Sequence, residues 1–247
     1  MSTLKDFFAR HPRTALGFSG GTDSAYLLYA GTSLGADVRP YYIKTQFQPA
    51  FELEDARRLA YELGVELTVI EADILAIDAV AENPPDRCYH CKRALFTLLA
   101  ERAASDGYME LIDGTNASDD PGDRPGTRAL KELRVLSPLR ECGITKADVR
   151  RLSREAGLFT HAKPSYACLA TRVPAGRRID AEALGRIETA ESALRVLGYD
   201  DLRVRLEEGG VRLELPEAQL ERAVRERDGI LRALDGMGRV TLDLRGR

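Results

Sequence analysis

The stretch TALGFSGGTDSAYLL, residues 14–28, decides the fold expected for this chain of 247 residues. Residues 14–18 are typical of a buried strand, and the pattern after Ser24 is typical of a helix. Between them, Gly20 and Gly21 let backbone N–H groups converge on an anion without interference from a Cβ atom. The positive end of the helix dipole points at the same place. We therefore expect this turn to bind a pyrophosphate group, with Asp23 placed to hold Mg²⁺.

The glycine turn differs from two better-known phosphate loops. It matches neither G-x-x-x-x-G-K-[ST], which indicates γ-phosphate chemistry, nor G-x-G-x-x-G, which indicates a dinucleotide. The string SGGTDS at 19–24 instead resembles the PP-loop of the N-type ATP pyrophosphatases, which cleave ATP between the α and β phosphates and pass AMP to a carboxylate or carbonyl. A strand-to-helix turn without a ligand is the alternative. The resemblance implies that ATP is bound by Ser19, Gly20, Gly21, Asp23 and Ser24.

Apolar, β-rich runs alternate with helical patterns in the first part of the chain. The expected strands are 14–18, 37–43, 65–70, 109–112 and 135–139, and the expected helices are 25–34, 52–63 and 91–104. Strands that are buried on both faces and separated by helices predict an α/β fold with a doubly wound parallel sheet. Ligands collect at the carboxyl ends of such strands, where we expect the Ser19 loop, Lys44, Asp113 and Ser137 to lie.

A second, smaller α+β domain is expected at the end of the chain. The pattern there is helix 181–197, strand 202–206, a turn at Gly209 and Gly210, strand 211–215, helix 217–234 and strand 239–244. We therefore expect a PP-loop domain at 1–175 and a small domain for substrate binding or oligomerisation at 176–247. In the first domain, Thr145 should cap a helix at 146–156 that Gly157 ends. Residues 113–126, rich in glycine and proline, should form a loop over the site.

The composition fits a protein with a packed core and no strongly basic surface. Hydrophobic residues make up 44% of the chain and charged residues 30%, with a formal net charge of −3. This charge gives no indication of a nucleic-acid partner. No stretch approaches the roughly 20 consecutive apolar residues of a membrane span, and the N-terminus lacks a signal-peptide pattern. We therefore expect a soluble, cytoplasmic protein that binds neither membrane nor nucleic acid.

Four cysteines without a secretion signal favour thiol or metal chemistry over a disulfide framework. Cys88 and Cys91 form a Cys-x-x-Cys pair directly before the helical run 93–104, so both thiols can point at one centre beside a helix N-terminus. The spacing suits zinc, an iron–sulfur cluster or a redox disulfide. Cys168, in an irregular segment between two cations, is a candidate third ligand or a small buried residue, and for Cys142 we prefer the small buried residue. A zinc site would be completed by His90, His161 or Cys142.

Six motifs follow one another across nearly the whole chain. They are SGGTDS at 19–24, DRCYHCK at 86–92, DGTNASDD at 113–120, SPL at 137–139, KPSYACLATR at 163–172 and RVR at 203–205. In this order they resemble the LarE family, the ATP-dependent sulfurtransferases of nickel-pincer nucleotide biosynthesis. The resemblance implies that ATP adenylylates a carboxylate of pyridinium-3,5-biscarboxylic acid mononucleotide and releases pyrophosphate. Sulfur then displaces AMP, which leaves a thiocarboxylate.

The same resemblance implies roles for residues outside the glycine loop. Cys88, Cys91 and the catalytic Cys168 match the family type in which three cysteines hold a 4Fe-4S cluster whose additional sulfide is transferred. In the other type, the cysteine matching Cys168 gives up its own sulfur and ends as dehydroalanine. Thr115 is expected to contact ATP. The substrate phosphate is assigned to Arg203, Arg205 and Glu191. The alternatives are an exposed face of an edge strand for the arginines and a solvated helix face for the glutamate.

Three other functions compete with this expectation. A tRNA thiolation enzyme also combines a PP-loop with cysteines, but it would normally add a basic RNA-binding surface. An amide-forming ligase related to NAD synthetase, or a domain that only senses adenine nucleotides, would give the cysteines no role. The resemblance further implies a homo-oligomer, a trimer or a hexamer, that serves lactate racemase maturation or another user of the nickel cofactor.

Overall fold

The computed structural model describes residues 3–119 and 125–247. Residues 120–124, which include Asp120 of the DGTNASDD motif and part of the expected loop 113–126, lie outside the described residues. The chain divides into two compact units, Met1–Ile74 with Asp86–Lys163 and Leu75–Pro85 with Pro164–Arg247. The division therefore falls earlier in the chain than the expected boundary at 175, and a short earlier segment joins the second unit.

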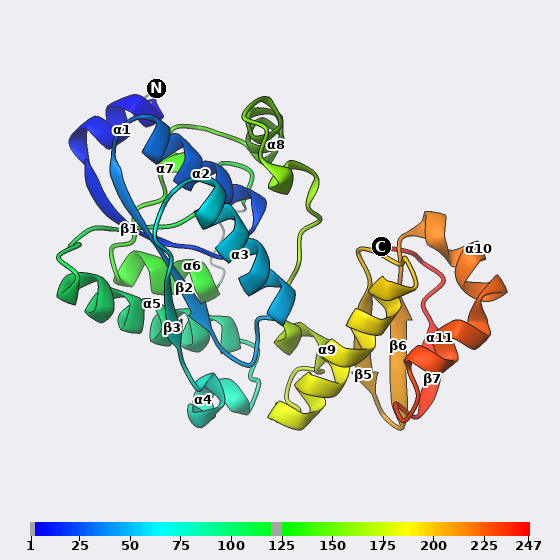
Figure 1. Ribbon diagram of the computed structural model, residues 1–247. Coiled ribbons are helices and arrows are strands. Elements are labelled where there is room, and N and C mark those ends of the chain that lie inside the picture. Colours follow the sequence, from blue (N-terminus) through cyan, green and yellow to red (C-terminus); the bar gives the residue numbers. More distant parts are fainter. Residues whose placement is uncertain (1–2, 120–124) are drawn as a thin grey trace. The chain divides into compact units, whose positions relative to one another are not determined.

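The first unit contains a parallel sheet with the strand order β3-β2-β1-β4 (Figure 1). Its strands are β1 (Arg13–Gly17), β2 (Asp37–Lys44), β3 (Thr68–Glu71) and β4 (Leu111–Ile112). Its helices are α1 (Leu4–Arg10), α2 (Thr22–Ser33), α3 (Ala50–Glu62), α5 (Arg87–Ser105), α6 (Pro125–Glu132), α7 (Pro138–Glu141) and α8 (Lys146–Glu155), with a 3-10 helix η2 (Phe159–Ala162). Another 3-10 helix, η1 (Ile74–Ala76), lies where the two units meet in the sequence.

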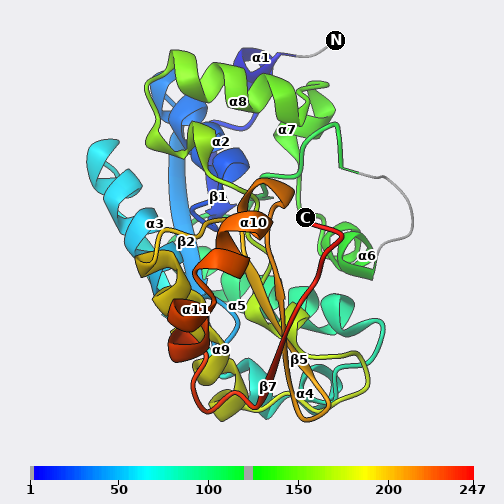
Figure 2. The same ribbon diagram turned by 90° about the vertical axis from the view of Figure 1, so that its right-hand side faces the viewer.

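Helices cover both faces of this sheet. Leu16 and Tyr42 belong to the core shared with α1, α2 and α3, whereas their strand neighbours Ala15 and Tyr41 pack with Leu99 of α5. Successive side chains of a strand point to opposite faces, so each strand contributes to both cores. Helix α8 lies beside α2 on the first face (Figure 2). The expected doubly wound α/β class is confirmed.

Residues 135–139 do not form the expected strand. Only Leu136 makes an isolated parallel bridge, to Ile112, and α7 begins at Pro138. Proline has no backbone N–H to donate to a ladder but fits the first turn of a helix. The bridge still brings residue 137 to the carboxyl end of β4.

The second unit is a small α+β body. Its strands β5 (Arg203–Glu207) and β6 (Gly210–Glu214) are antiparallel, and β7 (Arg239–Leu242) runs parallel to β6. The helices are α4 (Asp78–Ala81), α9 (Ala181–Val196), α10 (Glu217–Arg225) and α11 (Arg227–Ala233), with a 3-10 helix η3 (Leu169–Arg172). The expected helix 217–234 is thus divided at Glu226, and α9 packs against β5.

The early segment Leu75–Pro85 is tied to the second unit by backbone contacts. Ile179 N donates to Ala81 O at 2.7 Å, and Gly176 N donates to Asn83 O at 2.8 Å. In residues 3–119 and 125–247, no helix combines the length and the apolar character needed to span a membrane.

Candidate functional site

The glycine loop is held in shape by its two serines. Ser24 Oγ donates to Gly21 O at 3.2 Å and lies 3.2 Å from Ser19 Oγ, while Ser19 N donates to Ser24 Oγ at 3.3 Å. Gly20 has φ +69°, and a Cβ there would approach the carbonyl oxygen of Glu52 to 3.1 Å. The position therefore requires glycine. Helix α2 begins directly after Gly21, so its N-terminus faces the space beside the loop.

A cavity of about 320 Å³ opens beside this loop. This volume is within the roughly 300–1,000 Å³ usual for small-molecule sites. One part of its wall is apolar and includes Phe18, Ile43 and Phe96, which suits an aromatic base. The polar part of the wall includes Asp23, Ser24, Lys92, Asp113, Thr115 and Asp119. The cavity thus combines the two surfaces that an adenine nucleotide needs.

The DGT and SPL motifs meet at Asp113. Its carboxylate accepts hydrogen bonds from Ser137 Oγ at 2.7 Å, from Thr115 Oγ1 at 2.5 Å and from Thr115 N at 3.2 Å. The next residue, Gly114, packs on the start of α2, where a Cβ would come within 2.9 Å of Ser24 N. The hydrogen bonds to Asp113 therefore hold Thr115 at the cavity. Because Gly114 has no side chain, the segment that follows β4 can pack directly against the PP-loop.

Asp23 contacts two residues from separate parts of the chain. Lys146 Nζ lies 2.5 Å from Asp23 Oδ2, and Asn116 Nδ2 donates to Asp23 Oδ1 at 3.3 Å. Asp23, Asp113 and Asp119 all line the cavity, and carboxylate oxygens are the donors that Mg²⁺ prefers. Among the described residues these carboxylates are not grouped closely enough to hold a metal ion by themselves, so a magnesium ion here would also need phosphate oxygens of a bound nucleotide.

Lys163, the first residue of the KPSYACLATR motif, reaches the PP-loop. Its Nζ lies 3.3 Å from Gly20 O and 2.6 Å from Asp55 Oδ2 of α3, and its side chain is only 12% exposed. The motif therefore begins in the first unit and continues into the second unit.

The cysteine pair lies inside α5 and not before it. The helix begins at Arg87, so Cys88 and Cys91 occupy its first turns. Residues three apart share one helix face, as the expected common centre requires. Cys88 is exposed and Cys91 is half-buried. On the same helix, Lys92 lines the cavity beside the PP-loop.

Cys142 has a different setting. It packs against the hydrophobic core that contains α1 and α2, and burial raises the pKa of its thiol, with Glu141 adding to the effect. Cys142 is thus a half-buried packing residue in the structure. Across the part of the chain that the structure describes, no three His, Cys, Asp or Glu side chains are grouped so that they could hold a metal ion.

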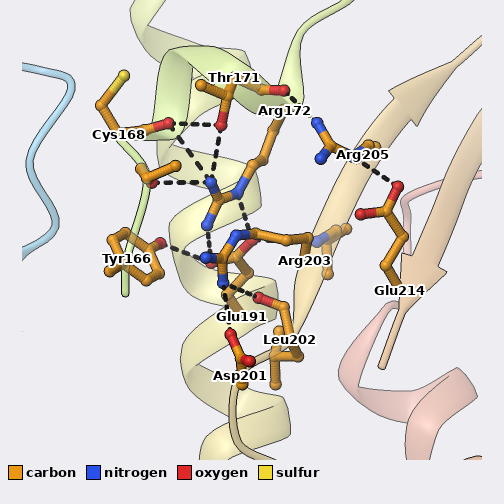
Figure 3. A network of polar contacts seen from close by, with 12 residues as sticks. Tyr166, Cys168, Thr171, Arg172, Glu191, Asp201, Leu202, Arg203, Arg205 and Glu214 are labelled. Atoms are coloured by element: carbon orange, nitrogen blue, oxygen red, sulfur yellow. Dashed lines mark hydrogen bonds and ion pairs between the residues drawn. The ribbon is translucent and has the colours of Figure 1, made fainter. Parts of the chain in front are cut away.

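Cys168 lies in the second unit, just before η3, and is half-buried. Figure 3 shows its sulfur pointing away from a network of polar contacts that involves its backbone. In that network, Thr171 Oγ1 donates to Cys168 O at 2.9 Å, and Arg172 Nη1 lies 3.4 Å from the same oxygen.

Arg203 and Glu191 are buried, so the alternatives of an exposed strand face for Arg203 and a solvated helix face for Glu191 are wrong. Arg203 is 2% exposed, and burial together with the charge of Arg172 lowers its pKa to about 10. Glu191 is 0% exposed. Burial alone would raise the pKa of Glu191, but the hydrogen bond and charge of Arg172, together with hydrogen bonds from Tyr166 and Val204 N, lower that pKa overall.

Arg205 is the more accessible member of the RVR pair. Its side chain is 34% exposed, and Nε donates to Glu214 Oε1 at 2.6 Å. It lines a cavity of about 660 Å³ together with Thr171 and Arg212. This cavity lies wholly within the second unit.

Sequence reasoning assigned no role to Lys146, Lys163 or Arg172. Lys163 and Arg172 are the first and last residues of the motif KPSYACLATR, so the motif itself indicated that they could have a role. Lys146 follows the helix cap Thr145, and nothing in its sequence surroundings marks it as a partner of Asp23.

The parallel sheet and the SGGTDS loop after its first strand place the chain among the PP-loop proteins. No family model matches the chain. The tRNA-specific 2-thiouridylase of Thermotoga petrophila is 24% identical over 193 residues, which cover 61% of this chain and 54% of that protein.

Two relatives match over the full length. The chain is 33% identical over 250 residues to the pyridinium-3,5-bisthiocarboxylic acid mononucleotide synthase of Lactiplantibacillus plantarum, covering 100% of this chain and 89% of that protein. It is 36% identical over 253 residues to an uncharacterized protein of Synechocystis sp., covering 100% and 94%. The chain belongs to the LarE family.

Proposed function

We propose that this protein is an ATP-dependent sulfurtransferase that converts a carboxylate of pyridinium-3,5-biscarboxylic acid mononucleotide into a thiocarboxylate. The observation that carries the proposal is the full-length match to a synthase whose name gives the bisthiocarboxylic product. The tRNA thiouridylase matches over only about half of its own length. The mononucleotide is therefore a better substrate candidate than tRNA.

Activation of the carboxylate has a clear physical reason. A free carboxylate resists attack because its leaving group would be oxide, so an oxygen of the substrate first attacks the α-phosphorus of ATP. The bond to the β-phosphate breaks and pyrophosphate leaves. Backbone N–H groups at Gly20 and Gly21, with Ser19 and Ser24, would bind the departing pyrophosphate.

Two further side chains complete the proposed ATP site. Thr115, fixed by Asp113, lines the cavity and would contact the nucleotide there. Asp23 would hold Mg²⁺, which neutralises charge on the phosphates when it is bound. In that state Lys146, which pairs with Asp23 in the structure, would be available to a phosphate oxygen.

Sulfur delivery is proposed to involve Cys168 with Cys88 and Cys91. Thiolates are the usual ligands of a 4Fe-4S cluster, and three of them would leave one iron open. When bound, such a cluster would supply a sulfide as the sulfur nucleophile. Cys168 is five residues after Lys163, so an extended chain places their Cα atoms at most roughly 18 Å apart. This tether supports delivery near the nucleotide loop that Lys163 contacts.

The alternative route uses Cys168 alone. Its sulfur would attack the acyl-adenylate carbon and the bond to AMP would break. A base would then remove the Cα proton, the Cβ–S bond would break, and the thiocarboxylate would leave dehydroalanine behind. Mass spectrometry of the protein after one turnover separates the routes, because only the sacrificial route removes the elements of hydrogen sulfide from Cys168.

The substrate phosphate is proposed to bind at Arg205. A guanidinium group can bind phosphate through two parallel hydrogen bonds, and the exposure of Arg205 leaves room for this. Arg203 and Glu191 are both buried and would stabilise the structure around this site. We propose a homo-oligomer as well, on the family resemblance alone.

Carboxylate activation can be tested with the purified protein, ATP and Mg²⁺. We expect exchange of pyrophosphate into ATP only when the pyridinium mononucleotide is added. Exchange that instead requires tRNA, or that occurs equally without any acceptor, would contradict the proposed substrate.

A further inference from the structure

The segment 165–171, which carries Cys168, has backbone carbonyl groups that bind arginine side chains. Arg203 Nη2 donates to Ser165 O at 2.8 Å, and Arg205 Nη1 donates to Thr171 O at 2.6 Å. Arg172 Nη1 donates to Ala167 O at 2.8 Å and lies 3.4 Å from Cys168 O. These contacts come from β5 and η3, and Figure 3 shows those of Arg172 and Arg205 reaching the segment. An irregular segment has no ladder to satisfy its carbonyls, so such donors decide its conformation.

The guanidinium group of Arg172 pairs with the carboxylate of Glu191. Arg172 is 1% exposed and Glu191 0%. Arg172 Nε and Nη2 donate to the two carboxylate oxygens at 2.7 and 3.1 Å. The same carboxylate accepts from Tyr166 Oη at 2.6 Å and from Val204 N at 3.0 Å. Glu191 therefore links α9, β5 and the segment 165–171 in one buried cluster of polar contacts.

We propose that Arg172 and Arg203, with Glu191 as the buried counter-charge, form an arginine clamp that fixes the backbone of the Cys168 segment and orients its thiol. They are positioning residues, because their guanidinium groups are occupied with protein carbonyls and carboxylates and are shielded from solvent. The clamp itself stands on the contacts above; only its significance for sulfur transfer rests on the proposed function.

The geometry distinguishes a clamp from a simple charge pair. The planar guanidinium of Arg172 reaches Glu191, Ala167 O and Thr171 Oγ1 at once, the last at 2.9 Å. A lysine carries the same charge but only as a compact point charge, and it cannot span these acceptors. Arg172→Lys therefore preserves the charge balance while it removes the carbonyl contacts.

The test compares full-length wild type with Arg172→Lys by amide hydrogen exchange and by the rate at which iodoacetamide alkylates Cys168. We expect exchange in peptides covering 164–172 to rise roughly tenfold or more, with the alkylation rate also changed, because the segment loses hydrogen bonds that close it. The pyridinium turnover should show a lower kcat with an unchanged KM for ATP. Unchanged exchange and unchanged alkylation would overturn the proposal.

Arg222→Lys is the matched control. Arg222 also lies in the second unit, pairs with Glu226 and donates to two backbone carbonyls, Leu197 O and Gly198 O. Arg222→Lys should leave amide exchange in the 164–172 peptides unchanged. An increase there as large as that caused by Arg172→Lys would overturn the proposal. If Arg172→Lys does not fold, Thr171→Val removes the hydroxyl contacts to Cys168 O and Arg172 and should raise exchange by roughly threefold.

Failure of the clamp differs from failure of the proposed function. If Cys168→Ala still forms the thiocarboxylate, Cys168 is not the sulfur-carrying residue, whatever the exchange data show. If Cys168→Ala is inactive while Arg172→Lys exchanges like wild type, the clamp is wrong and the function stands.

Discussion

Lys163 contacts Gly20: the Nζ atom lies 3.3 Å from the Gly20 carbonyl oxygen, in the middle of the PP-loop. Asp55 holds the same ammonium group at 2.6 Å. The lysine therefore places positive charge beside the loop proposed to bind pyrophosphate. It also stands five residues before Cys168, so the proposed activation and sulfur-transfer steps depend on adjacent parts of one motif.

We expect Lys163→Met to weaken ATP binding about tenfold, because it removes a charge-assisted hydrogen bond and leaves the Asp55 carboxylate uncompensated near the phosphates. Isothermal titration with ATP and Mg²⁺ measures the effect. Lys5→Met, on the exposed side of α1, is the control. Equal affinities for all three proteins would show that Lys163 has only a structural role.

Gly114→Ala should damage the nucleotide cavity. Its Cβ would lie 2.9 Å from Ser24 N and 3.2 Å from Ser24 Cα, both backbone atoms that cannot move without shifting α2. Overpacking of this kind costs about 1–3 kcal/mol, so ATP affinity should fall about tenfold or more. Gly185→Ala in α9, where the added Cβ would point into open space, should bind ATP normally. Normal binding by Gly114→Ala would contradict the placement of ATP here.

The buried pair of Arg172 and Glu191 makes stability depend on pH in acid. The folded pKa of Glu191 lies below the ordinary value of 4.5, so its contribution is complete above about pH 4.5 and is lost as pH falls through the lowered pKa. Glu191→Gln should lower the free energy of unfolding by about 3 kcal/mol at pH 7 and by less at pH 3. Urea unfolding at both pH values measures this, with the exposed Glu182→Gln of α9 as control. A difference that stays constant with pH would refute the assignment.

Oxygen-free preparation tests the proposed cluster. We expect brown protein that contains iron and acid-labile sulfide, and Cys88→Ala should lose both. Cys142→Ala should keep them, because Cys142 packs against the core of the first unit. Colourless wild-type protein with one bound zinc per chain would contradict the cluster and favour the zinc alternative.

The sequence predicted the elements whose signals are local. Strand β1, the PP-loop and α2 follow the order expected for residues 14–34, and Thr145 caps α8 with a capping box that includes Asp148. Gly157 has φ +71° just after that helix, as a C-terminal glycine should. These features depend on neighbouring residues, so a single sequence contains the information.

Features set by distant contacts were not predicted. The i, i+2 spacing of Arg203 and Arg205 indicates one strand face but not that the segment 165–171 covers it. The pairing of Lys146 with Asp23 likewise joins residues 123 positions apart. The apolar pattern of residues 135–139 predicts a strand, whereas in the structure Pro138 begins helix α7.

The most direct test of the central claim is mass spectrometry of the pyridinium mononucleotide after anaerobic incubation with the protein, ATP and Mg²⁺. We predict a product in which one carboxylate oxygen is replaced by sulfur, formed together with AMP and pyrophosphate and absent with Cys168→Ala. An unchanged mononucleotide, with ATP split only to ADP or with sulfur appearing in added tRNA, would contradict the account.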